Sequence, residues 1–212
     1  MSTCIRLAAA RDAEALLAIY APIVAETTIS FELEPPTSED MQRRIITTLP
    51  QYPWLVCETA GDILGYAYAS KHRERAAYQW SVDVSVYTHT RARRSGVGRA
   101  LYTSLFALLR LQGFYNAYAG ITLPNQASVG IHEALGFRPL GVYTAVGYKL
   151  GGWHDVCWWQ LALREHAGTP RPPAPFAALP QDAAWEAALE AGLAHLRLSG
   201  SHGGTTVQVL AH

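Results

Sequence analysis

The sequence predicts an α/β (α+β) domain in which helices and strands are mixed along the chain. Apolar residues recur at helical spacing in some segments and at every second position in others, so both kinds of element are expected. Half of the 212 residues are hydrophobic, which is enough for a single core with a small appendage. A proline- and alanine-rich stretch then interrupts the pattern. We therefore divide the chain into a domain at 1–165, a linker at 166–180, and a C-terminal helix with a flexible tail at 181–212.

Two helices and three strands are predicted in the N-terminal half. Asp12 and Thr37 are suitable N-cap residues for the two helices. A tight turn at 61–62 joins the first two strands. In the third strand apolar and polar residues alternate, so Asp83 falls on the polar face. The predicted elements are helices 12–26 and 37–49 and strands 54–59, 63–70 and 78–88.

The C-terminal half is predicted to contain three further helices and three strands. Asn125 is a suitable cap for the second of these helices, and Gly136 ends it. The last helix belongs to the C-terminal extension, which could pack on the domain or on a partner subunit. We favour the interpretation that it is a loosely tethered appendage without a catalytic role. The predicted elements are a helix from about residue 99, strand 115–121, helix 125–135, strands 140–150 and 153–163, and helix 181–198.

Composition excludes several classes of function. The formal net charge is zero, so nucleic acid is a poor candidate as a partner. No apolar run approaches the ~20 residues of a membrane span, and the N-terminus has no apolar signal core. The cysteines Cys4, Cys57 and Cys157 are scattered and odd in number. This pattern indicates reduced thiols in a cytoplasmic protein and predicts neither a zinc site nor a disulfide framework.

The most informative motif is a glycine-rich turn at Arg93-Arg94-Ser95-Gly96-Val97-Gly98, between a predicted strand and a predicted helix. Such a turn leaves the first N–H groups of the helix unpaired, and the helix dipole adds about half a positive charge. The motif therefore predicts a seat for a pyrophosphate. A dinucleotide-binding Rossmann domain is a weak alternative, because the third glycine is missing and no P-loop exists.

Seven short fragments, in this order, resemble the GNAT superfamily of acetyl-CoA-dependent N-acyltransferases, and in particular the phosphinothricin/methionine sulfoximine N-acetyltransferases. The resemblance covers about residues 4–163. It implies a mostly antiparallel sheet that splays at its middle strands, with acetyl-CoA as co-substrate in the gap, no metal, and a homodimer. The fragments are TISFE (28–32), RERAAYQW (73–80), SVY (85–87), GVG (96–98), LPN (123–125), HEALG (132–136) and WHDV (153–156).

The resemblance places two residues in catalytic positions, Asp83 and His132. Where this chain has Asp83 the family usually has Glu, proposed as the general base, and the shorter side chain could act through a water. His132 stands where many relatives have a Tyr that is thought to protonate the thiolate, and its imidazole could serve as acid or base. The competing interpretations are a solvated carboxylate and an ordinary polar core residue.

The resemblance also predicts contacts with acetyl-CoA. The strand around residues 84–88 would pair its backbone with the pantetheine arm, and a bulge there would free an N–H as oxyanion donor. Asn125 is expected to contact the arm besides capping its helix. The predicted cofactor-binding residues are Val84, Val86, Tyr87, Thr88, Arg93, Arg94, Ser95, Gly96, Val97, Gly98, Arg99, Asn125 and Ser128.

Five residues are predicted to bind the acceptor. Arg73 and Arg75 could converge on an anionic group, since guanidinium matches carboxylate or phosphinate oxygens. Phe31 and Trp80 could form pocket walls, although core packing explains aromatic residues equally well. Glu32 could pair with an arginine or with the substrate ammonium. The Trp-His-Asp sequence at 153–155 resembles a signature of the family and would lie near the pocket or a subunit interface.

The sequence therefore predicts an N-acetyltransferase that moves an acetyl group directly to the amine of a small amino acid or analogue. No cysteine stands in a nucleophile setting, which argues against an acyl-enzyme. Two alternatives remain open. One keeps the fold but takes another amine, such as a polyamine, an aminoglycoside or a protein N-terminus, and the other is a non-catalytic CoA-binding regulatory module.

Overall fold

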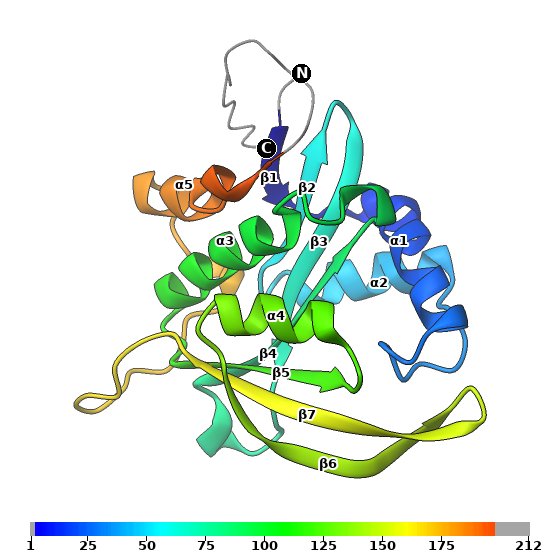
Figure 1. Ribbon diagram of the computed structural model, residues 1–212. Coiled ribbons are helices and arrows are strands. Elements are labelled where there is room, and N and C mark those ends of the chain that lie inside the picture. The colour runs from blue at the N-terminus through cyan, green and yellow to red at the C-terminus, as the bar shows by residue number, and fades with distance from the viewer. Residues whose placement is uncertain (1–2, 198–212) are drawn as a thin grey trace.

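The computed structural model describes residues 3–197, and its centre is a seven-stranded sheet in the order β1-β2-β3-β4-β5-β7-β6 (Figure 1). Neighbouring strands are antiparallel except for β4 and β5, which are parallel. The mostly antiparallel sheet predicted from sequence is thus confirmed. The strands are β1 Thr3–Leu7, β2 Trp54–Thr59, β3 Asp62–Lys71, β4 Ser81–Thr88, β5 Asn116–Thr122, β6 Arg138–Lys149 and β7 Gly152–Ala162.

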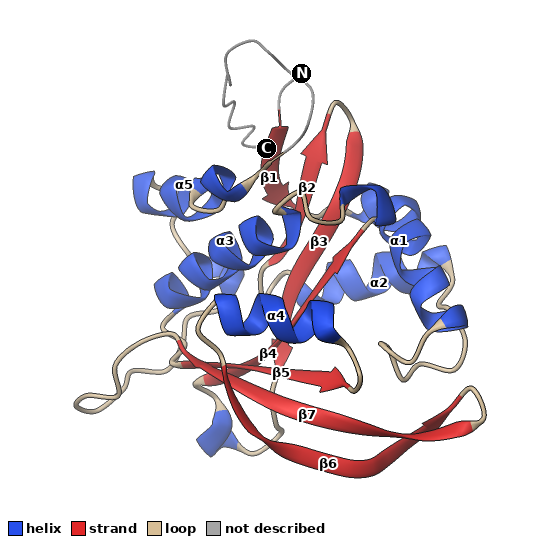
Figure 2. Cartoon of the chain, viewed as in Figure 1, coloured by secondary structure: helices blue, strands red, loops and turns tan. Residues whose placement is uncertain are grey.

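Helices cover both faces of the sheet (Figure 2). α1 and α2 pack against one face, where a cluster of tyrosines and a tryptophan from β2 and β3 completes the core. α3 packs against the other face, and α5 lies against α3. No described helix is both long and apolar enough to span a membrane. The helices are α1 Ala13–Glu26, α2 Ser38–Thr48, α3 Val97–Gln112, α4 Gln126–Ala134 and α5 Ala183–Glu190.

Local sequence signals explain two of the predicted helix starts. Thr37 accepts a hydrogen bond from the Asp40 N–H at 3.1 Å, and Asn125 accepts one from the Ser128 N–H at 3.1 Å, as expected of caps. The prediction that the Asp12 side chain caps the first helix is wrong. Its carboxylate accepts hydrogen bonds from the Arg6 guanidinium at 2.7 and 2.9 Å and from the Ala9 N–H at 2.7 Å, and it therefore ties β1 to the chain ahead of α1.

One strand was not predicted, and the boundaries of three other elements differ from the prediction. The strand that was not predicted is β1, in which only Ile5 of five residues is buried and which forms by pairing with β2. β4 begins at Ser81, because residues 76–78 form a 3-10 turn. α3 begins at Val97 and not near residue 99. The last helix ends at Glu190, and its predicted continuation to residue 198 is replaced by a 3-10 turn at 193–195.

The C-terminal extension is a packed part of the domain, which corrects its interpretation as a loose appendage. Trp185 and Leu189 are buried in the core that α3 forms with the sheet. Ser104 of α3 donates to the Leu189 carbonyl at 2.6 Å and accepts from the Gly192 N–H at 3.1 Å. The predicted linker is also anchored, since Phe176 within it is buried. The expected flexible tail lies mostly at 198–212, outside the described residues.

Gly96 is the position where backbone geometry is most demanding. Its φ is +82°, and a Cβ there would lie 2.0 Å from the His195 carbonyl oxygen. Gly130 in α4 is the matched contrast, because a Cβ there meets nothing within 4 Å. Substitution at the two glycines should therefore have opposite effects on stability.

We predict that Gly96→Ala lowers the free energy of unfolding by at least about 2 kcal/mol, because a left-handed alanine is strained and its Cβ displaces the C-terminal segment. Gly130→Ala should leave stability unchanged or raise it by up to about 1 kcal/mol. Urea unfolding of both variants followed by circular dichroism measures the difference. Equal stability of the two variants would contradict the packing of the extension on this turn.

Candidate active site

The site is organised by the divergence of β4 and β5. These parallel strands pair only where Ser81–Asp83 faces Asn116–Tyr118. Beyond Asp83 and Tyr118 the two strands separate, while β4 stays paired with β3 and β5 stays paired with β7 (Figure 1). The sheet therefore opens in its middle, as the family resemblance implied.

Every second residue of β4 directs its backbone N–H and C=O groups into this opening. The Trp80 carbonyl accepts from the N–H groups of residues 115 and 116 at 2.9 and 3.2 Å, so even-numbered residues face β5. The His89 N–H donates to β3 at 2.8 Å, so odd-numbered residues face the other way. The β3–β4 register has no shift, so β4 has no bulge of the kind that was considered as the source of a free N–H. The separation of the strands frees the donors instead. The residues whose backbone groups face the opening are Val84, Val86 and Thr88.

The glycine-rich turn ends at the open edge of β4. A Cβ on Gly98 would lie 3.7 Å from the Thr88 methyl and 3.8 Å from a Val86 methyl. α3 starts at Val97 without a side-chain cap, and its first intrahelical bond is that of the Ala100 N–H to the Gly96 carbonyl, at 2.9 Å. The three N–H groups before it are left for another acceptor.

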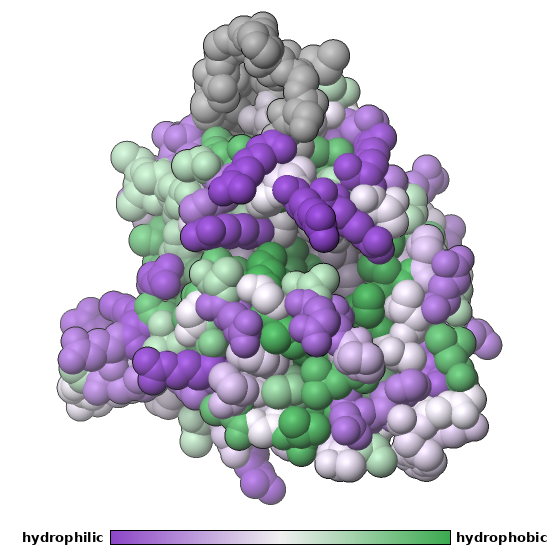
Figure 3. All heavy atoms as spheres, viewed as in Figure 1, coloured by the Kyte–Doolittle hydropathy of each residue, from purple (hydrophilic) through white to green (hydrophobic). Residues whose placement is uncertain are grey.

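Positive charge surrounds these free N–H groups. Arg93, Arg94 and Arg99 are exposed, and hydrophilic side chains gather over the start of α3 (Figure 3). Within residues 3–197 no ion pair involves any of the three guanidinium groups. An uncapped helix N-terminus with unpaired arginines fits a polyanion such as a pyrophosphate.

Asp83 lies at the point where the strands part. Its Oδ1 is 2.6 Å from Nδ1 of His72, and the two side chains are 30% and 10% exposed. Burial raises the pKa of the Asp83 carboxyl, against the opposing effects of His72 and Arg73. The His72 ring stacks on Tyr118, the β5 partner of Asp83, with centroids 4.3 Å apart. Asp83 is therefore half-buried and paired, which does not fit the competing interpretation of a solvated carboxylate, and its catalytic role stays a prediction.

His132 lies in the core, in agreement with the competing interpretation of a polar core residue. It is 3% exposed and packs between Tyr102 and Phe137 on the α3 side of the sheet. Its Nδ1 lies 2.7 Å from the Ser128 carbonyl and its Nε2 lies 3.3 Å from the Tyr102 hydroxyl. Burial lowers the pKa of His132, although the Ser128 carbonyl opposes this. The structure thus favours a neutral core histidine, and its catalytic role stays a prediction.

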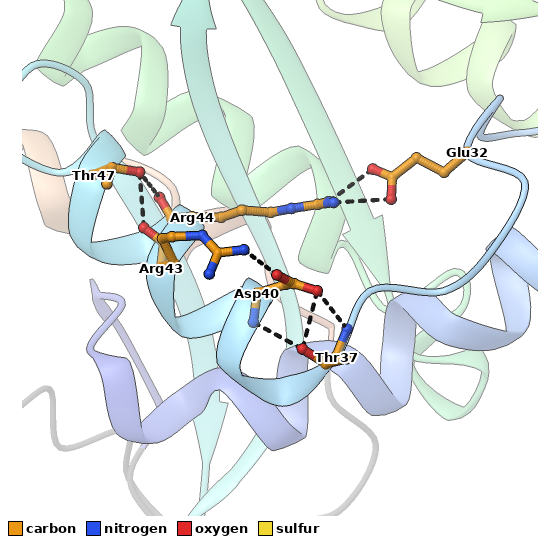
Figure 4. A network of polar contacts seen from close by, with 6 residues as sticks. All are labelled: Glu32, Thr37, Asp40, Arg43, Arg44 and Thr47. Carbon is orange, nitrogen blue, oxygen red and sulfur yellow. Dashed lines mark hydrogen bonds and ion pairs between the residues drawn. The ribbon is translucent and has the colours of Figure 1, made fainter.

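Glu32 is paired within the protein. It receives two hydrogen bonds from Arg44 of α2, at 2.7 and 3.0 Å (Figure 4). The Tyr20 hydroxyl donates a third, at 3.0 Å. Burial raises the pKa of Glu32, but these hydrogen bonds outweigh it and hold the pKa below its ordinary value. Of the two partners predicted for Glu32, an arginine or an ammonium, the structure supplies the arginine.

A second ionic group lies beside this pair on α2. Asp40 joins Thr37 and Arg43 at the start of the helix (Figure 4). The Arg44 guanidinium also borders a recess of about 100 Å³ whose other walls include Tyr68 and Met41. This recess opens on the α1–α2 side of the sheet, the face to which Asp83 also belongs.

The two arginines of the 73–80 segment do not share one target. Arg73 donates to the His72 carbonyl at 2.8 Å and lies over the Trp158 ring at 5.4 Å. Arg75 is exposed and begins a 3-10 turn. The Trp80 indole donates to the Arg171 carbonyl at 2.8 Å, which ties it to the anchored linker. The structure therefore does not support convergence of the arginines or a pocket role for Trp80, and an anion clamp stays a prediction.

The β6–β7 hairpin holds the loop that follows α1. The buried Lys149 ammonium donates to the Val24 carbonyl at 2.6 Å and to the Ser30 carbonyl at 2.7 Å. Phe31 lies directly over Gly147, where a Cβ would come within 2.1 Å of the ring. His154 is 2.8 Å from the Lys149 carbonyl. The Trp-His-Asp motif therefore shapes the hairpin that positions Phe31 and Glu32.

Sequence reasoning missed several of these residues. His72 adjoins the 73–80 fragment, and its place directly after a strand next to the strand of Asp83 was the available signal. Arg44 and Lys149 carried no signal, because their partners lie 12 and more than 100 positions away in the chain. Among residues 3–197, no three His, Cys, Asp or Glu side chains are grouped as a metal site.

An open sheet whose parallel middle strands part beside a glycine-rich helix start defines the acetyltransferase class of the GNAT type. Residues 5–158 match the Acetyltransferase (GNAT) domain, and the chain belongs to this family of enzymes.

Individual acetyltransferases are similar to this chain over most of its length. The chain is 42% identical over 171 residues to the phosphinothricin N-acetyltransferase of Streptomyces viridochromogenes, which covers 81% of this chain and 93% of the relative. It is 36% identical to the L-methionine sulfoximine/L-methionine sulfone acetyltransferase of Pseudomonas aeruginosa, over 77% and 96% of the two chains. The crystal structure of a phosphinothricin acetyltransferase from Sinorhizobium meliloti, in complex with AcCoA, aligns with a TM-score of 0.78 at 34% identity, over 84% and 98%.

We predict that Lys149→Met lowers the free energy of unfolding by about 2 to 3 kcal/mol, because two buried carbonyls lose a charged donor. Urea unfolding at neutral pH measures this loss. Lys71→Met is the matched control, since Lys71 is exposed and pairs only with Glu74 at the surface. Its substitution should change stability by less than about 1 kcal/mol. A Lys149 variant as stable as this control would show that the hairpin does not depend on the ammonium.

Proposed function

We propose that this enzyme transfers the acetyl group of acetyl-CoA to the amine of a small amino acid or analogue of the phosphinothricin or methionine sulfoximine type. The observation that carries the proposal is the opening between β4 and β5, with Asp83 at its apex and the free N–H groups of α3 at its other end. The names of the relatives support the class of acceptor.

The opening suits two parts of the co-substrate, the pantetheine arm and the pyrophosphate. The backbone groups of Val84, Val86 and Thr88 would pair with the amides of the pantetheine arm, as an added strand pairs with a sheet edge. The first N–H groups of α3, with the arginines of the turn, would hold the pyrophosphate. Asn125 caps α4 through its Oδ1, which leaves its amide nitrogen for the arm. The ring of Tyr87 would not bind acetyl-CoA, because it packs against the Tyr20 ring with centroids 5.0 Å apart. Tyr87 would contribute only by its position in β4.

Transfer would be direct, from thioester to amine. The Asp83 carboxylate would assist removal of the ammonium proton, and a β4 N–H would stabilise the oxyanion. Burial raises the pKa of Cys57 to about 12 and also raises the pKa of Cys157, so neither thiol is an activated nucleophile. Three free thiols also suit the reducing cytoplasm, where we place the enzyme.

The test of the proposal is CoA thiol release from acetyl-CoA with a panel of amines. We expect turnover with phosphinothricin, methionine sulfoximine or methionine sulfone, and little with glutamate, spermidine or an aminoglycoside. Mass spectrometry of the product should show one added acetyl group. Turnover only with spermidine or the aminoglycoside would overturn the acceptor class, and acetyl-CoA binding without turnover on any amine would overturn the enzymatic proposal.

The proposed enzyme would work as a homodimer. β6 is an edge strand of the sheet, and most of its side chains are exposed, so its apolar residues need a cover. A second copy of the chain offers the same apolar strand and would bury both by two-fold pairing. The exposed apolar residues of the hairpin are Leu140, Val142, Tyr143, Val146, Tyr148, Leu150 and Trp153.

We predict that the wild-type protein sediments as a dimer in analytical ultracentrifugation and that Val142→Asp sediments as a monomer, because a charge would then lie in the apolar interface. Leu111→Asp on α3 is the control, since Leu111 is exposed to a similar degree, 43% against 48%. It should remain dimeric. A wild-type monomer at micromolar concentration would exclude this interface.

A further inference from the structure

His72 occupies the apex of the opening together with Asp83. Its ring lies flat against Tyr118, with 15° between the planes, and meets the edge of Trp158 at 6.3 Å and of Tyr78 at 6.0 Å. Three aromatic side chains thus fix the orientation of the imidazole. Asp83 and Tyr118 are the last paired residues before the strands separate, so the ring lies where the opening begins.

The contact between the two side chains determines which nitrogen is available. Nδ1 of His72 is 2.6 Å from the Asp83 carboxylate, and a carboxylate only accepts hydrogen bonds. Nδ1 therefore carries the proton in the neutral ring, and Nε2 keeps a lone pair. Within the described chain, Nε2 has no hydrogen-bond partner. An oriented imidazole with a free lone pair is the arrangement of a general base.

We propose that His72 is the catalytic base of this enzyme and that Asp83 is a positioning residue, which fixes the tautomer of His72 and stabilises its imidazolium. The inference rests on the proposed acetyl transfer and assigns its proton acceptor. Asp83 is one methylene shorter than glutamate, and the imidazole that it holds extends its reach toward the amine.

In the proposed reaction His72 accepts a proton from the substrate nitrogen twice, once before the acetyl transfer and once during it. Nε2 first takes a proton from the substrate ammonium and releases it to solvent. The amine nitrogen then forms a bond to the thioester carbonyl carbon, and its second proton passes to Nε2. The adduct collapses with cleavage of the C–S bond, whose electron pair leaves with sulfur. The thiolate takes the proton from the imidazolium, which returns His72 to its neutral form.

The groups around the pair set its pH dependence. Arg73, next to His72 in the chain, favours the ionised Asp83, whereas burial opposes it. Tyr78 and Tyr118 face the imidazole from the 3-10 turn and from β5, and Tyr68 faces the carboxylate from β3. An ionised Asp83 is the form that holds the Nδ1–H tautomer. Activity through this pair should therefore fall as acidification protonates the Asp83 carboxylate.

The kinetic test compares His72→Phe, Asp83→Asn and their double variant with wild type, in thiol release with the accepted amine. Phenylalanine keeps the stacked ring and removes both nitrogens. We expect His72→Phe to lower kcat by about 10²- to 10⁴-fold, with the acetyl-CoA KM unchanged and the acid limb of the pH–rate profile lost. The double variant should be no slower than His72→Phe, because the two residues act as one unit.

His166→Phe is the matched control, since His166 also lies against a tyrosine, Tyr115, at 5.6 Å, but far along the chain from the apex and exposed. It should keep wild-type kcat, and imidazole in the buffer should partly restore His72→Ala. If His72→Phe keeps kcat within threefold with the wild-type acid limb, His72 only packs, and the inference is wrong. Multiplied losses in the double variant would likewise overturn it.

A measurement without turnover separates this inference from the proposed function. Long-range ¹H–¹⁵N correlation spectra of histidine-labelled protein report the tautomer of each ring. We expect the neutral His72 to carry its proton on Nδ1 in wild type and to lose that preference in Asp83→Leu. An Nε2–H tautomer in wild type would overturn the inference whichever amine the enzyme accepts, since such a ring has no lone pair at the site of reaction.

Discussion

The separation of two parallel strands after a single three-residue contact is the constraint on which the rest of this structure depends. β4 is paired with β3 from Val82 to Thr88, and β5 is paired with β7 along its whole length, so each strand is held from its outer side. The separation therefore sacrifices only inner hydrogen bonds, and it leaves a row of backbone donors and acceptors facing a gap. The same separation determines that Asp83 and Tyr118 lie at the apex, and it makes their neighbour His72 part of the site.

The open end of this gap depends on a part of the chain outside the matched domain. The Arg197 N–H donates to the Ser95 carbonyl at 2.7 Å, and the His195 carbonyl occupies the space beside Gly96. The glycine of the turn thus serves two purposes, since it adopts a left-handed conformation and it admits the C-terminal segment. Packing of α5 on α3 keeps this segment in place. The extension is in this sense a support for the start of α3, where an anion would bind.

Around the loop that follows α1, buried or half-buried charges are satisfied by partners within the protein. Lys149 binds two carbonyls of the segment around α1, and Glu32 is held by Arg44 and Tyr20. Leaving any of these charges unpaired would be costly, so the loop after α1 has a defined position against the β6–β7 hairpin. This explains why a charged group close to the site need not be a substrate ligand, as the pairing of Glu32 illustrates.

Much of the fold could be read from the sequence, because periodicity, caps and glycine turns act over a few residues. Thr37 and Asn125 cap their helices as expected, and the glycine-rich turn begins α3. The pairing of Asp83 with His72 and the burial of His132 could not be read in this way. They depend on which strands become neighbours and on which face of the sheet a side chain is packed, and local pattern does not encode either. The sequence by itself determined most of the elements and the family, whereas the tertiary structure decided which polar side chains meet at the opening, because those contacts join residues that are distant in the chain.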